Sequence, residues 1–542
     1  MLFIGLCLVV EITTGSSQFN SKAGKQPEII VLICLNCGVK LVHSTEDAAF
    51  WNNKAQNDIK TKLKEQSNTN VAENVILFLG DGMGLSTITA ARIYKGQQNG
   101  QKGEDAELTF EKFPFTGLVK TYNTDQQVPD SAGTATAFLC GVKSKAGTLG
   151  VDDNIQYANC SSTKGTEVTS ILDWSLTAGK SVGIVTTTRI THATPAAAFS
   201  HAASRDWEGD RSLNQNVVQQ GCKDIAYQLI MDNPDIQVIL GGGRRYLLSV
   251  NETDPELRYV SSYQRRDTSL VQEWIEDKKK RNKTYSYTWR KQEFDQINAD
   301  KTDFVLGLFE SSHMQYEDER NKTQEPSLQE MTIKAIEILK RNNNGFFLLV
   351  EGGRIDHGHH ATFGRRALEE TVMFDKAIGS AIEMTSESNT LVVVTADHSH
   401  VFMVAGYPTK GNDILGLVDN DIADDGMPYT TLVYGNGPVQ RVNLTGVDTR
   451  DYDYQQTSAV ELSSETHGGE DIPVYARGPM AHLFSGTHEQ NYIAHVMAYA
   501  SCVGQNQEHC KSPISGATTP YTFKYLPCLY FVLTVIFLSI VS

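Results

Sequence analysis

The sequence predicts an α/β fold: a mostly parallel central sheet with helices on both faces, plus a small inserted subdomain. Five short apolar runs, at residues 74–79, 181–185, 236–240, 346–350 and 391–395, lack the polar alternation of half-exposed strands. Runs of this kind are buried on both faces, as in parallel sheets. Helical segments alternate with them, which is typical of a doubly wound sheet.

Two of the expected helices have clear limits. Ser327 and Glu330 form the S-x-x-E signal of a helix start, and the polar residues 342–345 end that helix before the next strand. A second helix is expected over about residues 366–384.

Two segments interrupt the alternation. Residues 251–325 are rich in charged and aromatic side chains, and their basic run at 278–281 is expected to be a solvated helix end. Residues 406–465 are rich in Gly, Asp and Asn, with short strand-like pieces such as 429–433. The second segment is expected to be the inserted subdomain.

Composition excludes several classes of protein. The 542 residues include 48 basic and 64 acidic side chains, for a formal charge of −16, and 40% are hydrophobic. A chain this acidic is a poor non-specific ligand of nucleic acid, and no nucleic acid partner is expected. No sustained repeat supports a collagen-like or coiled-coil structure.

Both ends read as processing signals. The last 15 residues, 528–542, carry no charge, but about 20 apolar residues are needed to cross a bilayer. The small residues Ser515-Gly516-Ala517 and a spacer precede them, a pattern typical of a glycolipid (GPI) anchor signal. We expect removal of 516–542 and attachment at Ser515, with Ser512 as the alternative site and a short transmembrane helix as the alternative structure.

At the N-terminus, the apolar runs 2–10 and 29–42 could each serve as the core of a secretory signal. The second run follows two lysines, so we expect residues 1–43 to be a leader and 44–515 to be one domain. Five cysteines then remain, of which Cys160–Cys222 and Cys502–Cys510 are the expected disulfides and Cys140 a buried free thiol. Candidate glycosylation sequons lie at Asn159, Asn251, Asn282, Asn321 and Asn443.

Acidic residues follow three of the predicted core strands. Asp81, Glu351 and Asp397 each come within two residues of a strand end, where the sites of open α/β sheets lie. One such acid is commonplace as a turn or helix cap. Three carboxylates gathered at one edge are costly to bury unless cations neutralise them, so the pattern favours a metal site.

Further motifs carry ligand and nucleophile types. Ser131, in DSAGTAT, is placed at a helix N-terminus that favours an anion or a phosphoester, although a simple cap is the alternative. Asp356 and His360 share one helix face, the spacing of two ligands of one ion, and the distant His467 offers a third. Thr194 has a hydroxyl suited to Mg²⁺, and Arg205 has a fork that matches phosphate.

These motifs resemble those of the alkaline phosphatases, specifically the animal, membrane-anchored members, over about residues 51–510. DSAGTAT, VEGGRIDHGHH, TADHSH and ETHGGED occur in the order of that family. The resemblance implies hydrolysis of small-molecule phosphate monoesters at alkaline pH through a phosphoserine at Ser131, with Arg205 clasping the phosphate. It also implies a homodimer held at the outer face of the plasma membrane by its anchor, and it identifies residues 406–465 with the family's crown subdomain.

The resemblance further implies two Zn²⁺, one Mg²⁺ and one Ca²⁺ per chain. The zinc ligands would be, for one ion, Asp356, His360 and His467, and for the other, Asp81, Asp397 and His398. The magnesium ligands would be Asp81, Thr194 and Glu351, with His192 behind them. The calcium ligands would be Glu256, the Phe309 carbonyl, Glu310 and Glu325. Relatives often carry Ser at position 194 and Asp at position 325, so this chain departs from the pattern there.

Rival functions are disfavoured by the residues around Ser131. Sulfatases need a Cys/Ser-x-Pro-x-Arg context, which Ser131 lacks, and nucleotide pyrophosphatases usually have a threonine nucleophile. A surface receptor with a decayed catalytic site is disfavoured because all the nucleophile and ligand positions are intact. A receptor role in addition to catalysis stays open.

Overall fold

The computed structural model describes residues 46–266 and 268–511. The helix α1 (Ala48–Lys62) belongs to one compact unit, and residues from Glu65 onward form a second, much larger unit. The expected leader, the anchor signal and the attachment sites Ser512 and Ser515 lie outside the described residues. None of the helices in the described ranges is long and apolar enough to cross a bilayer.

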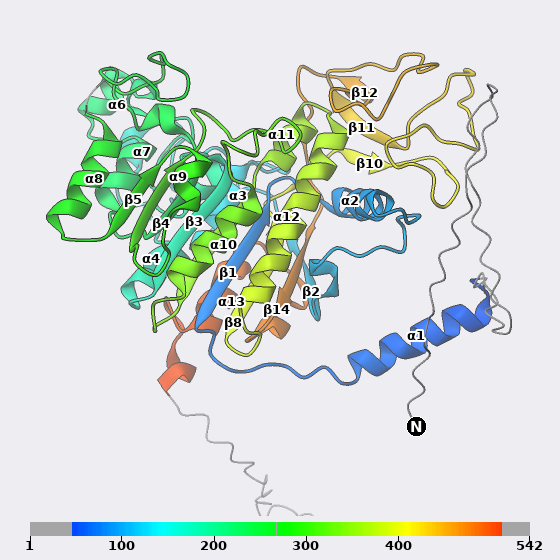
Figure 1. Ribbon diagram of the computed structural model, residues 1–542, viewed down its shortest axis with the longest axis horizontal. Helices are drawn as coiled ribbons and strands as arrows, with labels where there is room; N and C mark the ends of the chain where they lie inside the picture. The colour runs from blue at the N-terminus through cyan, green and yellow to red at the C-terminus, as the bar shows by residue number, and fades with distance from the viewer. Residues whose placement is uncertain (1–45, 267, 512–542) are drawn as a thin grey trace, which may run out of the picture. The chain divides into compact units, whose positions relative to one another are not determined.

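A ten-stranded sheet forms the centre of the larger unit, in the order β15-β2-β14-β8-β1-β7-β3-β4-β6-β5 (Figure 1). Its strands are β1 (Asn74–Gly80), β2 (Phe115–Lys120), β3 (Ser181–Arg189), β4 (Val238–Gly242), β5 (Tyr285–Thr288), β6 (Phe304–Leu308), β7 (Phe346–Gly352), β8 (Thr390–Ala396), β14 (Ile472–Arg477) and β15 (Gly486–Glu489). β1 pairs in parallel with both β7 and β8, and β14 is antiparallel to its neighbours β8 and β2. The predicted mostly parallel sheet is confirmed.

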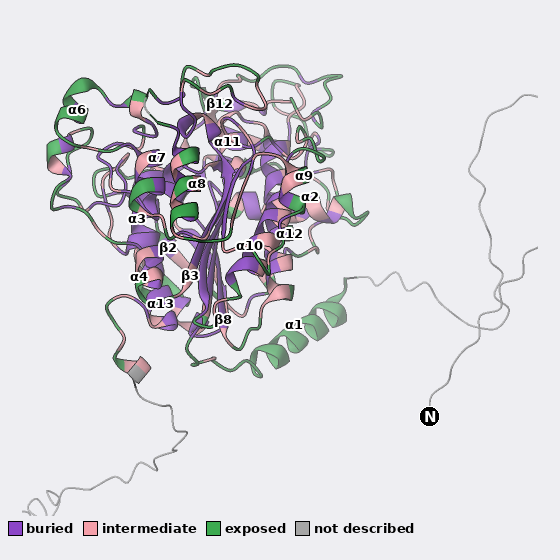
Figure 2. Cartoon of the chain, turned by 60° about the vertical axis from the view of Figure 1, so that its left-hand side comes forward, coloured by how far each residue is buried: buried purple, intermediate pink, exposed green. Residues whose placement is uncertain are grey.

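Helices cover both faces of this sheet, which Figure 2 shows nearly edge-on with α10 and α12 on one side and α3, α4 and α13 on the other. The helices of the larger unit are α2 (Leu85–Gln98), α3 (Ser131–Cys140), α4 (Ile171–Thr177), α5 (Ala193–Ala197), α6 (Gln215–Gln219), α7 (Ile225–Tyr227), α8 (Leu270–Lys280), α9 (Lys291–Asp295), α10 (Leu328–Leu339), α11 (Arg354–His360), α12 (Gly364–Met384) and α13 (Tyr492–Ser501). α10 begins with the predicted capping box of Ser327 and Glu330.

Within residues 406–465 lie two strands of a separate three-stranded sheet, made of β10 (Phe402–Val404), β11 (Leu432–Gly437) and β12 (Ser458–Glu461). The strand expected at 429–433 is therefore shifted: Thr430 instead makes an isolated bridge with Leu417, and the strand begins at Leu432. The strand expected at 236–240 likewise begins two residues later, at Val238. The ladder pairing of β4 with β3 and β6 begins only at Val238, whereas Thr430 makes a single bridge before β11 begins.

The expectation of a solvated basic helix end at 278–281 is wrong for one residue. Lys278 is fully buried, and its ammonium group donates to the Pro234 carbonyl at 2.6 Å and to Asp277 at 2.7 Å. Its aliphatic stem covers apolar surface while the charge finds local acceptors. A run of identical charges does not reveal which member faces the core.

The cysteine predictions are confirmed. Cys160 is bonded to Cys222 and Cys502 to Cys510, while Cys140 is a buried free thiol. The first bond closes a separation of 62 residues, which restricts the unfolded chain. Four of the five candidate sequon asparagines are exposed, whereas Asn159 is half-buried and donates to Gln156 at 2.9 Å.

The burial of the central strands predicts that two aromatic-to-alanine substitutions differ greatly in their effect on the free energy of unfolding. Phe78 in β1 is fully buried, so Phe78→Ala should lower the free energy of unfolding by about 3–5 kcal/mol. Tyr407 is 85% exposed, and Tyr407→Ala should change it by less than about 0.5 kcal/mol. Urea unfolding of both variants measures the difference, and equal losses would contradict the assignment of β1 to the core.

Candidate metal centre and nucleophile

The register of the three central strands brings the acidic residues together. Gly80 of β1 is paired with Gly352 of β7 and with Ala396 of β8, so the carboxyl ends of these strands meet at one level. Asp81, Glu351 and Asp397 therefore lie at the same edge, and each is fully buried. Burial, then repulsion from Asp397, Asp356 and Glu351, raises the pKa of Asp81 well above its ordinary value.

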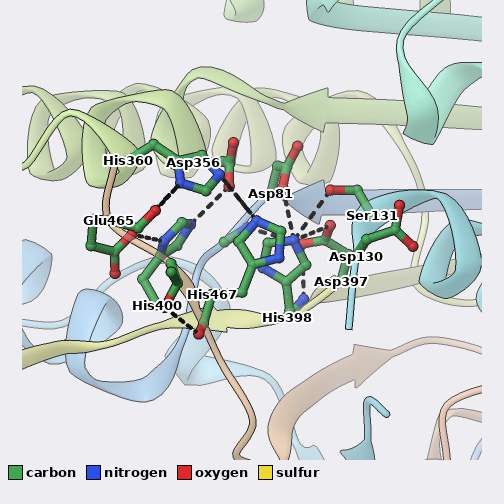
Figure 3. Close-up of polar contacts among 12 residues, drawn as sticks. Asp81, Asp130, Ser131, Asp356, His360, Asp397, His398, His400, Glu465 and His467 are labelled. Carbon is green, nitrogen blue, oxygen red and sulfur yellow. Dashed lines mark hydrogen bonds and ion pairs between the residues drawn. The ribbon is translucent and has the colours of Figure 1, made fainter. Parts of the chain in front are cut away.

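Ser131 lies at the first position of α3, beside this edge (Figure 3). Its hydroxyl is 3.2 Å from Nε2 of His398. Asp130 caps the helix by accepting from the backbone N–H groups of Ala132 and Gly133 at 3.2 and 3.1 Å. Ser131 is therefore at the predicted helix N-terminus, and Asp130, the residue before it, is the cap that uses these two N–H groups.

Two histidines and a carboxylate form the first ligand cluster. Nδ1 of His360 lies 2.6 Å from the Glu465 carbonyl, and Nδ1 of His467 lies 2.7 Å from the Pro129 carbonyl. A carbonyl only accepts, so both neutral rings carry their proton on Nδ1. Their Nε2 lone pairs then face each other at 3.1 Å and face Oδ1 of Asp356 at 3.3 and 3.4 Å.

The second cluster also combines a histidine with carboxylates: His398, Asp397 and Asp81. Nε2 of His398 lies 3.0 Å from Oδ2 of Asp397 and 3.7 Å from Oδ1 of Asp81, while Nδ1 is near the Ser399 carbonyl at 3.2 Å. Asp397 also accepts from the Gly82 N–H at 2.9 Å, which holds the turn after β1 against β8. The His398 and His467 rings stack with centroids 3.5 Å apart, so the two clusters are adjacent.

The third group surrounds Glu351. One of its oxygens accepts from the hydroxyls of Thr186 and, at 3.1 Å, Thr188, both on β3. Burial raises the pKa of Glu351 to about 7, although Thr186, Thr194 and Thr188 lower it. Thr194, in α5, is fully buried beside this carboxylate. The residues predicted for magnesium are thus brought together.

Arg205 pairs with the residue that precedes Ser131. Its guanidinium pairs with Asp130 at 3.1 Å and lies 3.2 Å from Nε2 of His192. Since Asp130 also caps α3, one carboxylate fixes both the helix start and the arginine fork. His192 lies beside Arg205, where burial and then the Arg205 charge lower its pKa well below the ordinary value.

Sequence reasoning assigned no role to His400 and Glu465, which the structure places in the centre of the site. Nε2 of His400 is 2.8 Å from Oδ1 of Asp356, and Nδ1 is 2.6 Å from Glu465. Burial lowers the pKa of His400, but Glu465 and Asp356 outweigh it and raise the pKa to about 10. The pairing of His400 with His467 across β9 (Ser399–His400) and β13 (His467–Gly468) creates this contact.

The candidate calcium residues also converge. Glu256, Phe309, Glu310 and Glu325 line one small cavity of about 260 Å³ in residues 251–325. Burial and the neighbouring Glu310 raise the pKa of Glu325 to about 9, and burial and Glu256 raise the pKa of Glu310. Such mutual repulsion is what a bound cation relieves.

The donor set of the central site fits metal ions. Among the described residues, both carboxylate oxygens of Asp81, one of Glu351 and one of Asp397 have no hydrogen-bond donor, although all are buried. Three imidazole lone pairs converge on the same space, and carboxylates with neutral imidazoles are the ligands that Zn²⁺ binds. Unpaired buried acceptors are costly, and cations would satisfy them.

The comparisons with known proteins decide the family. A family model described as alkaline phosphatase matches residues 72–503. This chain belongs to the alkaline phosphatase family. It is therefore an enzyme that hydrolyses phosphate monoesters and depends on metal ions, as the motifs of the sequence indicated.

Curated relatives match along most of the chain. The tissue-nonspecific isozyme of alkaline phosphatase from Rattus norvegicus is 50% identical over 526 residues, which cover 94% of this chain and 100% of the relative. An alkaline phosphatase from Gadus morhua is 53% identical over 468 residues, covering 84% of this chain and 98% of the relative.

Among solved structures, alkaline phosphatase from Thermus thermophilus has a TM-score of 0.58 at 21% identity, covering 82% of this chain and 94% of that chain. The enzyme from the Antarctic bacterium TAB5 has a TM-score of 0.54 at 24% identity, covering 81% and 100%. These two likenesses show a shared fold.

The crowded carboxylates predict that Asp81→Asn changes the Tm in opposite directions in the metal-free and in the metal-loaded protein. In the chelated protein, Asp81→Asn removes a buried charge that its neighbours repel, so the Tm should rise by about 1–3 °C. In the protein loaded with zinc and magnesium, the same change removes a ligand, so the Tm should fall. Calorimetry with and without chelator measures both.

Asp300→Asn is the matched control, because Asp300 is exposed and the charge change is the same. It should leave the Tm unchanged in both states. A fall in Tm for the chelated Asp81→Asn protein would contradict the electrostatic argument.

Proposed function

We propose that Ser131 is the nucleophile and that hydrolysis proceeds through a phosphoserine. The observation that carries this proposal is the position of the Ser131 hydroxyl, buried at the start of α3 and 3.2 Å from Nε2 of His398. In the first step the Ser131 oxygen loses its proton and bonds to phosphorus, the bond from phosphorus to the alcohol oxygen breaks, and the alcohol leaves with a proton that balances the one Ser131 gave up. In the second step a water oxygen bonds to phosphorus, the bond from phosphorus to the Ser131 oxygen breaks, and one water proton restores the hydroxyl as inorganic phosphate is released.

We propose two Zn²⁺ and one Mg²⁺ per chain in the three groups described above. The zinc residues are Asp356, His360 and His467 for one ion, and Asp81, Asp397 and His398 for the other. The magnesium residues are Asp81, Thr194 and Glu351. When bound, these ions supply positive charge to the phosphoryl oxygens and lower the pKa of the attacking hydroxyl. The orphaned oxygens and the converging imidazole lone pairs support this assignment.

The chain's own residues supply orientation and charge. Arg205, held by Asp130, presents a guanidinium fork to two phosphoryl oxygens, a match of planar geometry. The Glu465 and Pro129 carbonyls fix the tautomers of His360 and His467 before any ligand arrives. Glu465 and His400 hold Asp356 in place. Preorganised charge of this kind is the main contribution to phosphoryl transfer.

Three further features are proposed from the sequence pattern and family membership. The mature chain is a catalytic domain of residues 44–515, anchored by glycolipid at Ser515 to the outer face of the plasma membrane. It is a homodimer whose crown subdomain comprises residues 406–465. Its secretory route is supported by the two disulfides and by the exposed sequons Asn251, Asn282, Asn321 and Asn443.

Removal of the Ser131 hydroxyl tests the mechanism. Ser131→Ala should lower kcat for p-nitrophenyl phosphate by about 10⁴-fold or more, because no phosphoserine can form. Zinc and magnesium content should stay at the wild-type level, since Ser131 is not in the proposed ligand sets. Ser212→Ala, at an exposed serine, is the control. Unchanged turnover in Ser131→Ala would overturn the nucleophile assignment.

A fourth ion, Ca²⁺, is proposed in the cavity of Glu256, Phe309, Glu310 and Glu325. Saturating Ca²⁺ at 100 times its Kd should stabilise the chain by about 2.7 kcal/mol, measured as a rise in Tm after removal of calcium alone. Glu310→Gln should abolish this rise and leave the zinc content unchanged. A Glu310→Gln protein with the full response to calcium would refute the site.

A further inference from the structure

A second cavity, separate from the metal centre, lies against α13. Its volume is about 970 Å³, at the upper end of the ~300–1,000 Å³ typical of small-molecule sites. Residues 69–71, the segment 480–483, α13 and residues 506–510 form its walls. Figures 1 and 2 place α13 toward the end of the sheet opposite α11, which carries the zinc residues Asp356 and His360.

One face of α13 lines the cavity, and its members differ in exposure: His495 is exposed, Tyr492 and Tyr499 are half-buried, and Val496 is buried. Tyr492, His495, Val496 and Tyr499 follow the i, i+3, i+4, i+7 spacing of one helix face, and all four line the cavity. The opposite face, with Ile493 and Met497, is already buried in the core. A helix with only one buried face normally exposes polar side chains on the other.

The cavity wall presents flat rings for stacking. Tyr499 and His509 stack with centroids 3.7 Å apart, and His482 lines the same space with Phe115 packed behind it. The disulfide of Cys510 with Cys502 holds the His509 segment against the end of α13. The site is therefore formed before a ligand binds, which lowers the entropy cost of binding.

The charge of the lining selects the ligand. The cavity residues, all within the described part of the chain, include three imidazoles and no carboxylate, although the chain has 64 acidic side chains. Imidazole and amide N–H groups can donate to an anion, and no carboxylate of the lining repels one. The wall therefore suits an aromatic molecule that is anionic.

We propose that this cavity is a regulatory binding site for a small aromatic anion: a planar ring system that carries a carboxylate or sulfonate group. The contacts of α13 and of the two residues just before it supply the route to the proposed catalytic centre. Gln490 donates to the Asp397 carbonyl at 2.7 Å, and the Asn491 amide donates to the Gly141 carbonyl at 3.0 Å. Nε2 of His495 also lies 3.0 Å from the Gly141 carbonyl.

Gly141 is the C-cap of α3, and Ser131 is the first residue of that helix. A ligand that displaces the His495 ring would therefore act on α3 at one end and, through Gln490, on the segment that carries Asp397. His495 of α13 and the two residues that precede the helix thus contact both parts of the proposed catalytic centre, so occupancy and turnover are coupled. The proposal that the ligand regulates turnover rests on the proposed function. The proposal that the cavity binds an aromatic anion does not.

The fluorescent aromatic anion 8-anilinonaphthalene-1-sulfonate is the probe. Titration of the full, metal-loaded chain should show saturable binding of one probe per chain. Tyr499→Ala removes a stacking face, and Asn506→Asp places a carboxylate in the exposed rim without a change of shape. Each should weaken binding by about tenfold. Asn154→Asp, an exposed position outside the lining, adds the same charge and should leave the Kd unchanged.

Turnover of p-nitrophenyl phosphate should change at least twofold as the probe saturates, with a midpoint equal to the Kd, and Asn506→Asp should shift both midpoints together. Absence of saturable binding, or equal affinity in wild type, Tyr499→Ala and Asn506→Asp, would overturn the binding site. Binding without any change in turnover would overturn the regulation. Binding of the probe is also measured in Ser131→Ala. An unchanged Kd there would show that binding in the cavity does not depend on whether Ser131 is the nucleophile.

Discussion

Buried negative charge at the carboxyl edge of β1, β7 and β8 is the constraint on which the rest of the structure depends. Asp81, Glu351, Asp356 and Asp397 are all withdrawn from water, and burial first, then the repulsion of the other three, raises the pKa of Asp81. A fold does not keep such a cluster for stability, because apolar residues of similar volume would be less costly. The cluster is intelligible as a cage for cations, and the catalytic proposal follows from that.

Main-chain groups, rather than further charges, prepare the ligands. The backbone carbonyls of Glu465 and Pro129 accept hydrogen bonds from the Nδ1–H groups of His360 and His467. Both Nε2 lone pairs are thereby turned toward Asp356. The Gly82 N–H steadies Asp397. Orientation by backbone costs no additional buried charge, and it leaves the carboxylate oxygens available to metal. Asp130 likewise has two roles with one side chain: it caps α3 and it orients Arg205.

The remainder of the chain offsets the cost of this centre and connects it to distant surfaces. The central strands are almost wholly buried, and two disulfides restrict the unfolded chain. α13 packs on α3, and Gln490, two residues before α13, donates to the Asp397 carbonyl. This stretch therefore contacts the helix of the proposed nucleophile and the segment of a proposed metal ligand while α13 lines a separate cavity, and packed elements of this kind shift as units.

The sequence by itself determined the sheet, the expected limits of α10 and α12 and the cysteine pairing, and it pointed to the acids and histidines that the structure gathers at the proposed metal centre. Those features rest on local patterns: apolar runs, capping signals, and acids or histidines at fixed spacing. Only the tertiary structure decided that His400 bridges Asp356 and Glu465, that Asp130 consumes the N–H groups of α3, that Lys278 is buried, and that α13 lines a cavity. Each of these depends on which segments meet across long separations, and that information is absent from any single stretch of the chain.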